Sequence, residues 1–145
     1  MEIKIKRLNK RAKIPTFGTE FSAGADLYCA EEHEISVCSG QKCSIGTGIS
    51  MEIPEGYVWL VFARSGLACK NGLRLCNSVG VIDADYRGEI KVVLHNDSEY
   101  VREIKPGERV AQMIVMPYPK VSFIEAEELS DTVRGESGFG GTGRF

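Results

Sequence analysis

Short runs of alternating or β-branched hydrophobic residues recur along the whole chain. A strand that buries one face alternates apolar and polar side chains, so each run predicts a β-strand. The predicted strands are residues 3–7, 25–30, 34–38, 43–53, 57–63, 73–76, 89–96, 100–104, 109–118 and 120–126. Gly, Pro, Asp and Asn separate them at a spacing typical of antiparallel sandwiches and barrels. The pattern therefore predicts an all-β fold, an antiparallel β-barrel or jelly roll.

Two segments depart from this pattern. Residues 65–71 have the pattern of one short helix, with Ser65 as a possible N-cap and Gly72 just beyond the C-terminal end. Residues 134–145 are rich in glycine and contain too few apolar side chains to pack a core. We therefore expect residues 1–133 to form a single barrel domain and residues 134–145 to form a flexible arm.

Composition and charge narrow the class of protein. The 145 residues are 43% hydrophobic and 26% charged, as in an ordinary globular domain. The net charge of −2 gives no global field that would attract nucleic acid or an anionic membrane. No run approaches the roughly 20 apolar residues that a membrane-spanning helix needs. We expect neither nucleic acid nor a membrane as a partner.

The cysteines favour a reducing compartment. There are five of them, an odd number without a C-x-x-C pair, and only two histidines could join them as ligands. This pattern disfavours a zinc site and a disulfide framework. We expect free thiols in an intracellular protein, cytoplasmic or, in a eukaryotic or viral setting, nuclear.

One candidate for anion binding lies where an apolar run meets the predicted helix. Arg64, Ser65 and Gly66 combine a cation, a hydroxyl and the unpaired N–H groups of a helix start. The alternative is structural, with Ser65 as a plain helix cap and Arg64 in a surface ion pair.

A second candidate is the segment 77–89, in which two apolar runs flank a polar turn and predict a β-hairpin. The turn holds Asp83, Asp85 and Tyr86. A carboxylate beside a bound phosphate can polarise a water as general base, and a tyrosine ring can form the floor of a sugar pocket. Aspartates are also common turn formers, so a purely structural role stays open.

Gln112 is a third candidate. It is separated from Val110, Ile114 and Met116 by an even number of positions, so in a strand its side chain is predicted to point to the same inward face as these apolar residues. A buried amide must be hydrogen-bonded, so Gln112 either ties down a loop or reaches a site. The neighbouring Arg109 is interpreted as a structural ion pair rather than a ligand.

The glycine-rich end matches G-x-G-x-x-G at residues 138–143. A dinucleotide fingerprint is excluded, because that motif needs a following helix and only two residues remain. Arg134, Phe139 and Thr142 leave a loop suited to wrapping a polyphosphate and stacking on a base. A plain disordered tail is the alternative.

Five segments together resemble, in order and spacing, the motifs of the homotrimeric dUTPase family: residues 22–30, 63–68, 80–89, 107–113 and 134–143. The resemblance covers nearly the whole chain. It implies an antiparallel β-barrel subunit, a homotrimer, and hydrolysis of dUTP to dUMP and pyrophosphate with Mg²⁺. It also implies active sites assembled between subunits, each closed by the C-terminal arm of a neighbour.

The resemblance assigns roles to individual residues. Asp83 would be the general base for water attack on the α-phosphorus, Gln112 would help position that water or a phosphate, and Asp26 would hold Mg²⁺ through water. The groups expected around the base, sugar and phosphates are Asn77, Gly80, Val81, Ile82, Tyr86, Lys91, Arg64, Ser65 and Gly66. The groups expected to close the site are Arg134, Phe139, Gly140, Gly141 and Thr142.

Two positions depart from the family pattern. Ala63 stands where the family usually has proline, and Gly141 stands where it usually has serine. The first change leaves the turn into the phosphate site less rigid, and the second removes one hydroxyl donor.

Two rival interpretations remain. A dCTP deaminase-like or bifunctional relative would typically read Ile-Asp-Pro-Gly in the hairpin, whereas Ala84 and Asp85 follow Asp83 here. A non-catalytic nucleotide-binding β-barrel would have lost the base or the closing arm, and this chain carries both.

Overall fold

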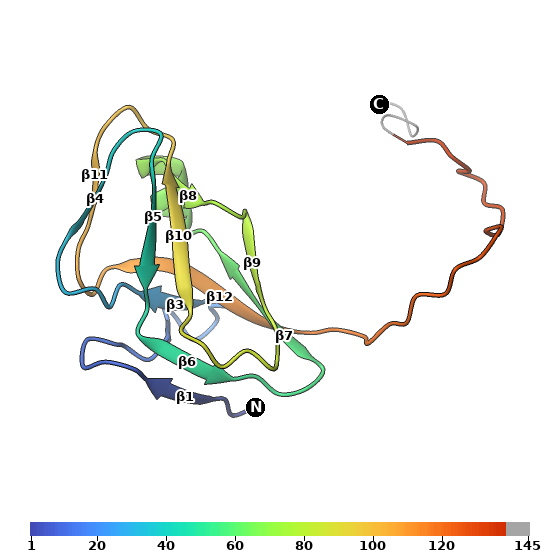
Figure 1. Ribbon diagram of the computed structural model, residues 1–145, viewed down its shortest axis with the longest axis horizontal. Coiled ribbons are helices and arrows are strands. Elements are labelled where there is room, and N and C mark those ends of the chain that lie inside the picture. The colour runs from blue at the N-terminus through green and yellow to red at the C-terminus, as the bar shows by residue number, and fades with distance from the viewer. Residues whose placement is uncertain (139–145) are drawn as a thin grey trace.

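The computed structural model describes residues 1–138, and nearly every regular element in them is a β-strand (Figure 1). The strands are β1 (Lys4–Arg7), β2 (Thr16–Phe17), β3 (Ala25–Tyr28), β4 (Ile35–Val37), β5 (Lys42–Gly46), β6 (Ile49–Glu52), β7 (Tyr57–Phe62), β8 (Leu73–Leu75), β9 (Val79–Ile82), β10 (Lys91–Asn96), β11 (Arg102–Ile104) and β12 (Arg109–Pro117). The predicted all-β class is confirmed.

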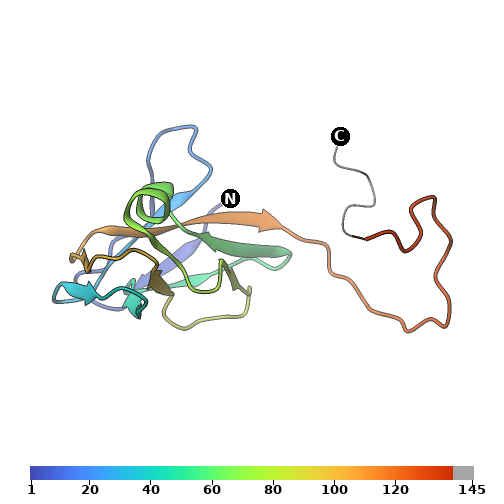
Figure 2. The same cartoon turned by 90° about the horizontal axis from the view of Figure 1, so that it is seen from above.

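The strands form four antiparallel sheets wrapped around one core (Figures 1 and 2). The largest has the order β2-β3-β12-β7-β9, and a three-stranded sheet has the order β5-β10-β8. Two ribbons, β1-β6 and β11-β4, complete the barrel. Side chains such as Leu27, Ile45, Ile49 and Leu94 are fully buried between the sheets, so a hydrophobic core holds strands that are distant in the sequence together.

The longest strand, β12, corrects one expectation from the sequence. Ala111, Met113 and Val115 pack on the core, so Gln112 points to the opposite face of the sheet rather than inward. The register of β12 against β3 shifts between Arg109 and Ala111, a bulge that reverses the parity expected from Val110.

The predicted helix is a single wide turn, η1 (Gly66–Lys70). Ser65 occupies the N-cap position as predicted, but it has helical angles (φ −54°, ψ −40°) and its side chain makes no capping hydrogen bond. Gly72 does have the left-handed conformation expected just after a helix, with φ +70°. The hydroxyl of Ser65 is therefore not engaged in a helix cap.

The predicted strand at residues 120–126 is absent. The sheet ends at Pro117, and Pro119 follows, because proline cannot donate to a strand ladder. The N–H of Tyr118 still donates to Gly56 O at 3.0 Å, and beyond it the chain leaves the barrel as an exposed segment (Figure 1). Alternating apolar residues predicted a strand there, but the barrel places no partner strand beside them.

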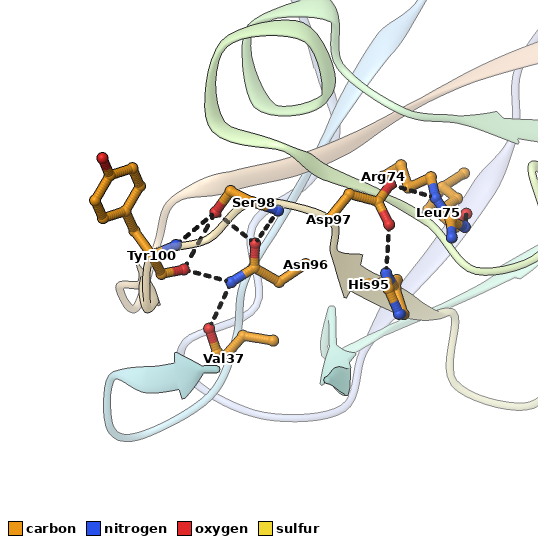
Figure 3. A network of polar contacts seen from close by, with 8 residues as sticks. All are labelled: Val37, Arg74, Leu75, His95, Asn96, Asp97, Ser98 and Tyr100. Atoms are coloured by element: carbon orange, nitrogen blue, oxygen red, sulfur yellow. Dashed lines mark hydrogen bonds and ion pairs between the residues drawn. The ribbon is translucent and has the colours of Figure 1, made fainter. Parts of the chain in front are cut away.

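A polar network fixes the end of β10 (Figure 3). The fully buried Asn96 donates to Val37 O (2.8 Å) and Tyr100 O (2.7 Å), and its Oδ1 accepts from Ser98 N–H (2.9 Å). Beside it, the Arg74 guanidinium holds the pKa of the exposed Asp97 carboxyl below its usual range. The network anchors the C-terminal end of β10, the strand that begins at Lys91.

The five cysteines are free thiols. Burial raises the pKa of Cys29 and Cys43, which keeps these two thiols protonated and unreactive near neutral pH. Within residues 1–138, no helix has the length and apolar character needed to cross a membrane.

Candidate active site

The predicted site residues of the barrel gather in two separate cavities. The hairpin cavity, about 310 Å³, is lined by Asn77, Gly80, Val81, Ile82, Asp83, Tyr86 and Lys91, among others. The arginine cavity, about 480 Å³, is lined by Asp26, Arg64, Ser65, Gly66 and Gln112, and also by Arg109.

One strand separates the two cavities. Val61 lines the hairpin cavity and Phe62 lines the arginine cavity, and these are consecutive residues of β7. Consecutive side chains of a strand point to opposite faces of the sheet. Phe62 lies opposite Gln112 in the register, and Gln112 lies opposite Asp26, so these three share the face turned away from the core. The cavities therefore lie on opposite faces of the five-stranded sheet.

The hairpin cavity exists because its two strands are not paired with each other. β9 pairs with β7, whereas β10 pairs with β5 and β8, so the predicted β-hairpin is wrong as a hydrogen-bonded unit. The two arms diverge into different sheets and leave space between them. In the part of the chain that the structure describes, the second edge of β9 has no partner strand. Its N–H and C=O groups are available to a ligand.

Small residues keep this cavity open. A Cβ at Gly80 would lie 3.1 Å from Val61 Cβ and 3.6 Å from Asn77 Nδ2, so a side chain there would crowd the wall. Just before β9, Ser78 adopts a left-handed conformation (φ 60°), and Val79 N–H donates to Asn77 O at 2.6 Å. This tight turn places the Asn77 side chain beside the open strand edge.

Tyr86 and Asp83 both line the hairpin cavity. The Tyr86 hydroxyl donates to Glu89 O at 2.9 Å, and its ring lies so close to Gly88 that any Cβ there would collide with it. The hydroxyl end of the ring is held by these two contacts, while the outer surface of the ring stays half exposed. Asp83 is exposed, and within residues 1–138 its carboxylate accepts no hydrogen bond and joins no ion pair. That carboxylate is free to bind and polarise a water.

The arginine cavity is built around one buried carboxylate. Asp26, 8% exposed, accepts from Arg64 Nε at 2.9 Å and from Arg109 Nη1 at 3.2 Å. Two guanidinium groups thus share a single negative charge, which leaves an excess of positive charge at the cavity wall. Guanidinium groups held in this way suit the bidentate binding of phosphate.

Gln112 connects this cavity to the loop before η1. Its Nε2 donates to Ala63 O at 3.1 Å, which fixes the residue directly before Arg64. A Cβ at Gly24 would lie only 2.9 Å from Gln112 Oε1, so the Gln112 side chain packs closely against this backbone and would have to shift for a larger residue. Gln112 therefore ties down a loop, which is one of the two alternatives left open by the sequence, and its side chain also lines the arginine cavity.

Arg109 lines the arginine cavity, although the sequence analysis did not assign it to a site. It forms the expected ion pair, but its partner is Asp26 and its side chain lines the arginine cavity. The bulge after Arg109 decides this orientation. No local pattern in the sequence marks that bulge, so only the register of β12 against β3 could have revealed the role.

Of the residues expected to close the site, only Arg134 lies in the described part of the chain, and it lines neither cavity. Arg134 lies on the exposed segment, where its Nε donates to Ser137 O at 2.9 Å. Phe139, Gly140, Gly141 and Thr142 lie outside the described residues.

The donor set limits how a metal ion could bind. Residues 1–138 contain no cluster of three His, Cys, Asp or Glu side chains that could hold a metal by themselves. Mg²⁺ commonly uses one or two carboxylates, several waters and the phosphates of a substrate. Asp26, a single carboxylate beside an anion-binding wall, fits that mode and does not fit a cage built from protein ligands alone.

Comparison with known proteins decides the family. The sequence model of the dUTPase family matches residues 10–143. The chain belongs to the dUTPase family. A deoxyuridine 5'-triphosphate nucleotidohydrolase from Nautilia profundicola is 48% identical over 99% of this chain and 100% of its own length. The enzyme of the same name from Hydrogenobaculum is 44% identical over 99% of each chain.

Solved dUTPase structures share the fold. A mutant dUTPase of the staphylococcal phage 80alpha has a TM-score of 0.89 and 29% identity, covering 97% of this chain and 98% of its own. A second mutant, with dUpNHpp, has a TM-score of 0.85 and 29% identity, covering 98% of both chains. A mutant of the phage phi11 dUTPase, described with a structural Mg(II) ion, has a TM-score of 0.79 and 25% identity, covering 88% of this chain and 98% of its own. The resemblance to the family and the expected jelly-roll-like fold are both confirmed.

Proposed function

We propose that this protein hydrolyses dUTP to dUMP and pyrophosphate. Membership of the dUTPase family and the activity named for relatives such as the Nautilia enzyme support this function. One observation in the structure carries the proposal: an uncommitted carboxylate, Asp83, lines a nucleoside-sized cavity, and a wall with two arginines is available for phosphates.

The hairpin cavity binds the nucleoside in this proposal. Asn77 and the backbone of residues 80–82 read the edge of the uracil, because β9 offers unpaired N–H and C=O groups there. A 5-methyl group would collide with this close backbone, which excludes thymine. Lys91 lies at the same cavity and approaches the base, and the ring of Tyr86 lies under the deoxyribose.

The arginine cavity binds the phosphate chain. A triphosphate carries roughly four negative charges near neutral pH, and each must meet a cation or an N–H donor. Arg64 and Arg109 supply the cations, and Ser65, Gly66 and Gln112 supply neutral polar groups. Asp26 sets the direction of both guanidinium groups and would hold Mg²⁺ through water, which would neutralise part of the phosphate charge when it is bound.

Asp83 is the general base. It accepts a proton from a water whose oxygen forms a bond to the α-phosphorus, while the bond to the bridging oxygen breaks and pyrophosphate leaves. Phosphoryl transfer needs positioning and neutralisation of charge more than a covalent nucleophile. The proposed site therefore needs no activated serine or cysteine.

We infer that each site is shared between copies in a homotrimer. The two cavities lie on opposite faces of one sheet, so the hairpin cavity of one copy must meet the arginine cavity of another. The exposed segment after β12 carries Phe123 (96% exposed), Ile124 (87%) and Leu129 (90%), apolar side chains that gain from contact with a neighbour. The arm 134–145 would then close a neighbour's site.

Incubation of the purified protein with dUTP and Mg²⁺ tests the function directly. We expect release of pyrophosphate and dUMP, with no ammonia released from dCTP. Tight binding of dUTP without turnover would instead support a non-catalytic nucleotide-binding barrel. Ammonia from dCTP would move the assignment to a deaminase-like enzyme.

The assembly has its own test. Light scattering or native mass spectrometry should give a mass near three times the 16.0 kDa of one chain. A monomer that turns over dUTP at full rate would contradict the shared site, because a single chain presents the two cavities on opposite faces.

Tyr86→Ala is expected to reduce the preference for dUTP over UTP by about tenfold, since loss of the ring leaves room for a 2′-hydroxyl. The ratio of kcat/KM for the two nucleotides measures this effect. Tyr86→Phe is the matched control, because it keeps the ring and loses only the hydrogen bond to Glu89 O. Equal selectivity in all three proteins would place sugar recognition elsewhere.

A further inference from the structure

Glu89 contacts two residues that line the hairpin cavity, Tyr86 and Lys91, and also a buried turn at Gly48. Its backbone oxygen accepts the Tyr86 hydroxyl at 2.9 Å, and its carboxylate lies 3.8 Å from Lys91 Nζ. The other carboxylate oxygen accepts the N–H of Gly48 at 2.8 Å. The Glu89 side chain, 27% exposed, therefore links the cavity wall to a segment about forty positions earlier in the sequence.

That earlier segment, residues 46–50, is a rigid support that we call the 46–50 anchor. Thr47 Oγ1 donates to Ile90 O at 2.5 Å, and Ile90 N–H donates to Ile49 O at 2.9 Å. Ser50 Oγ donates to Arg87 O at 2.6 Å. Thr47 and Ser50 are buried, so the bond to Ile90 is shielded from water and the bond to Arg87 is partly shielded. The stretch from Arg87 to Ile90 is thus held from one side along its whole length.

A second carboxylate holds the same anchor without touching the cavity. Glu31 Oε1 accepts the N–H of Gly46 at 2.6 Å. An ideal Cβ on Gly46 would lie 2.7 Å from Glu89 Oε1 and 3.0 Å from Glu31 Oε1, so both carboxylates converge where glycine leaves room. Glu31 does not line the hairpin cavity, whereas Glu89 does. The chain therefore contains its own matched control for the role of Glu89.

We propose that Glu89 is a positioning residue of the nucleoside site, which acts through Tyr86 and Lys91. One carboxylate oxygen fixes the wall to the 46–50 anchor, and the other holds the Lys91 ammonium at the cavity. The fixed backbone of Glu89 in turn holds the Tyr86 ring by its hydroxyl. The inference rests on the proposed function, because it assigns the base and the sugar to this cavity.

Three variants test the role. We expect Glu89→Ala to raise the KM for dUTP about tenfold, as for the loss of hydrogen bonds to a charged group, and to lower the preference for dUTP over UTP. Glu89→Gln keeps an acceptor for Gly48 and should recover part of the loss. Glu31→Ala should lower the melting temperature to a similar extent as Glu89→Ala while KM and selectivity stay close to wild type.

Equal KM and equal selectivity in Glu89→Ala and Glu31→Ala would overturn the proposal. The effects of both substitutions would then be explained by the loss of a contact to the 46–50 anchor alone. If Glu89→Ala does not fold, a double-mutant cycle of Glu89→Gln with Lys91→Met decides instead. Non-additive effects on KM support the link between the two side chains, and additive effects refute it. A wild-type protein that releases no pyrophosphate from dUTP would refute the proposed function itself, a result distinct from failure of the Glu89 role.

Discussion

Replacement of Asp83 by asparagine is expected to lower kcat for dUTP by about a thousandfold, within the range that a general base contributes. The carboxylate is exposed at the hairpin cavity and, within the described chain, is bonded to no other group. Asparagine has nearly the same shape but cannot take a proton from water. Because no contact in the fold depends on this side chain, the melting temperature and the affinity for dUTP should stay nearly constant.

Asp85→Asn is the matched control for this experiment, since Asp85 is exposed in the same turn but does not line the cavity. Steady-state turnover gives kcat, and calorimetry with dUTP and the asparagine variant gives the affinity. A near-normal rate in Asp83→Asn would remove this residue from the role of base. An equal loss in both variants would indicate that charge in the turn matters rather than proton transfer.

Removal of residues 134–145 is expected to reduce kcat/KM about a hundredfold while the barrel stays folded. Residues 134–138 are exposed, as is the segment from residue 120 that leads to them, so their removal takes no packing from the core. The expected loss comes from the missing Arg134 cation and from water that reaches an open site. The number of chains in the assembly and the melting temperature should not change.

Two smaller changes separate these contributions. Arg134→Ala removes only the cation and should account for part of the loss, whereas Glu136→Ala alters an exposed charge of the same segment and should have little effect. A truncated protein with the kcat/KM of the wild type would show that residues 134–145 have no role in catalysis. A truncated protein that no longer assembles would show that these residues hold the subunits together rather than close the site.

Much of the fold could be predicted because the alternation of side chains is local. Most predicted strands correspond to observed ones. The run 43–53 splits into β5 and β6, because the chain turns at Gly46, Thr47 and Gly48, and Gly48 has φ +65°. The two-residue strand β2 is too short to give a periodic signal. The run 120–126 alternates correctly but has no partner strand beside it in the barrel.

Many residues that line the two cavities were named from the sequence, but their arrangement was not predictable. Asp83, Tyr86 and Lys91 do line one cavity, and Asp26, Arg64 and Gln112 line another. The orientation of Gln112, the use of Arg109 and the divergence of β9 from β10 all depend on the pairing of strands far apart in the sequence. A bulge in β12 and the choice of β7 as partner for β9 set these features. Neither the bulge nor this pairing can be read from the local pattern of apolar and polar residues.

The position of the two cavities on opposite faces of one sheet has a consequence for inheritance. In the proposed trimer, a chain with a damaged arginine cavity still lends an intact hairpin cavity to its neighbour, and the reverse is also true. Where two alleles are expressed together, mixed assemblies would therefore contain some whole sites made from two faulty gene products. The harm done by a mutation would depend on which face it affects in each partner, and not only on its own severity.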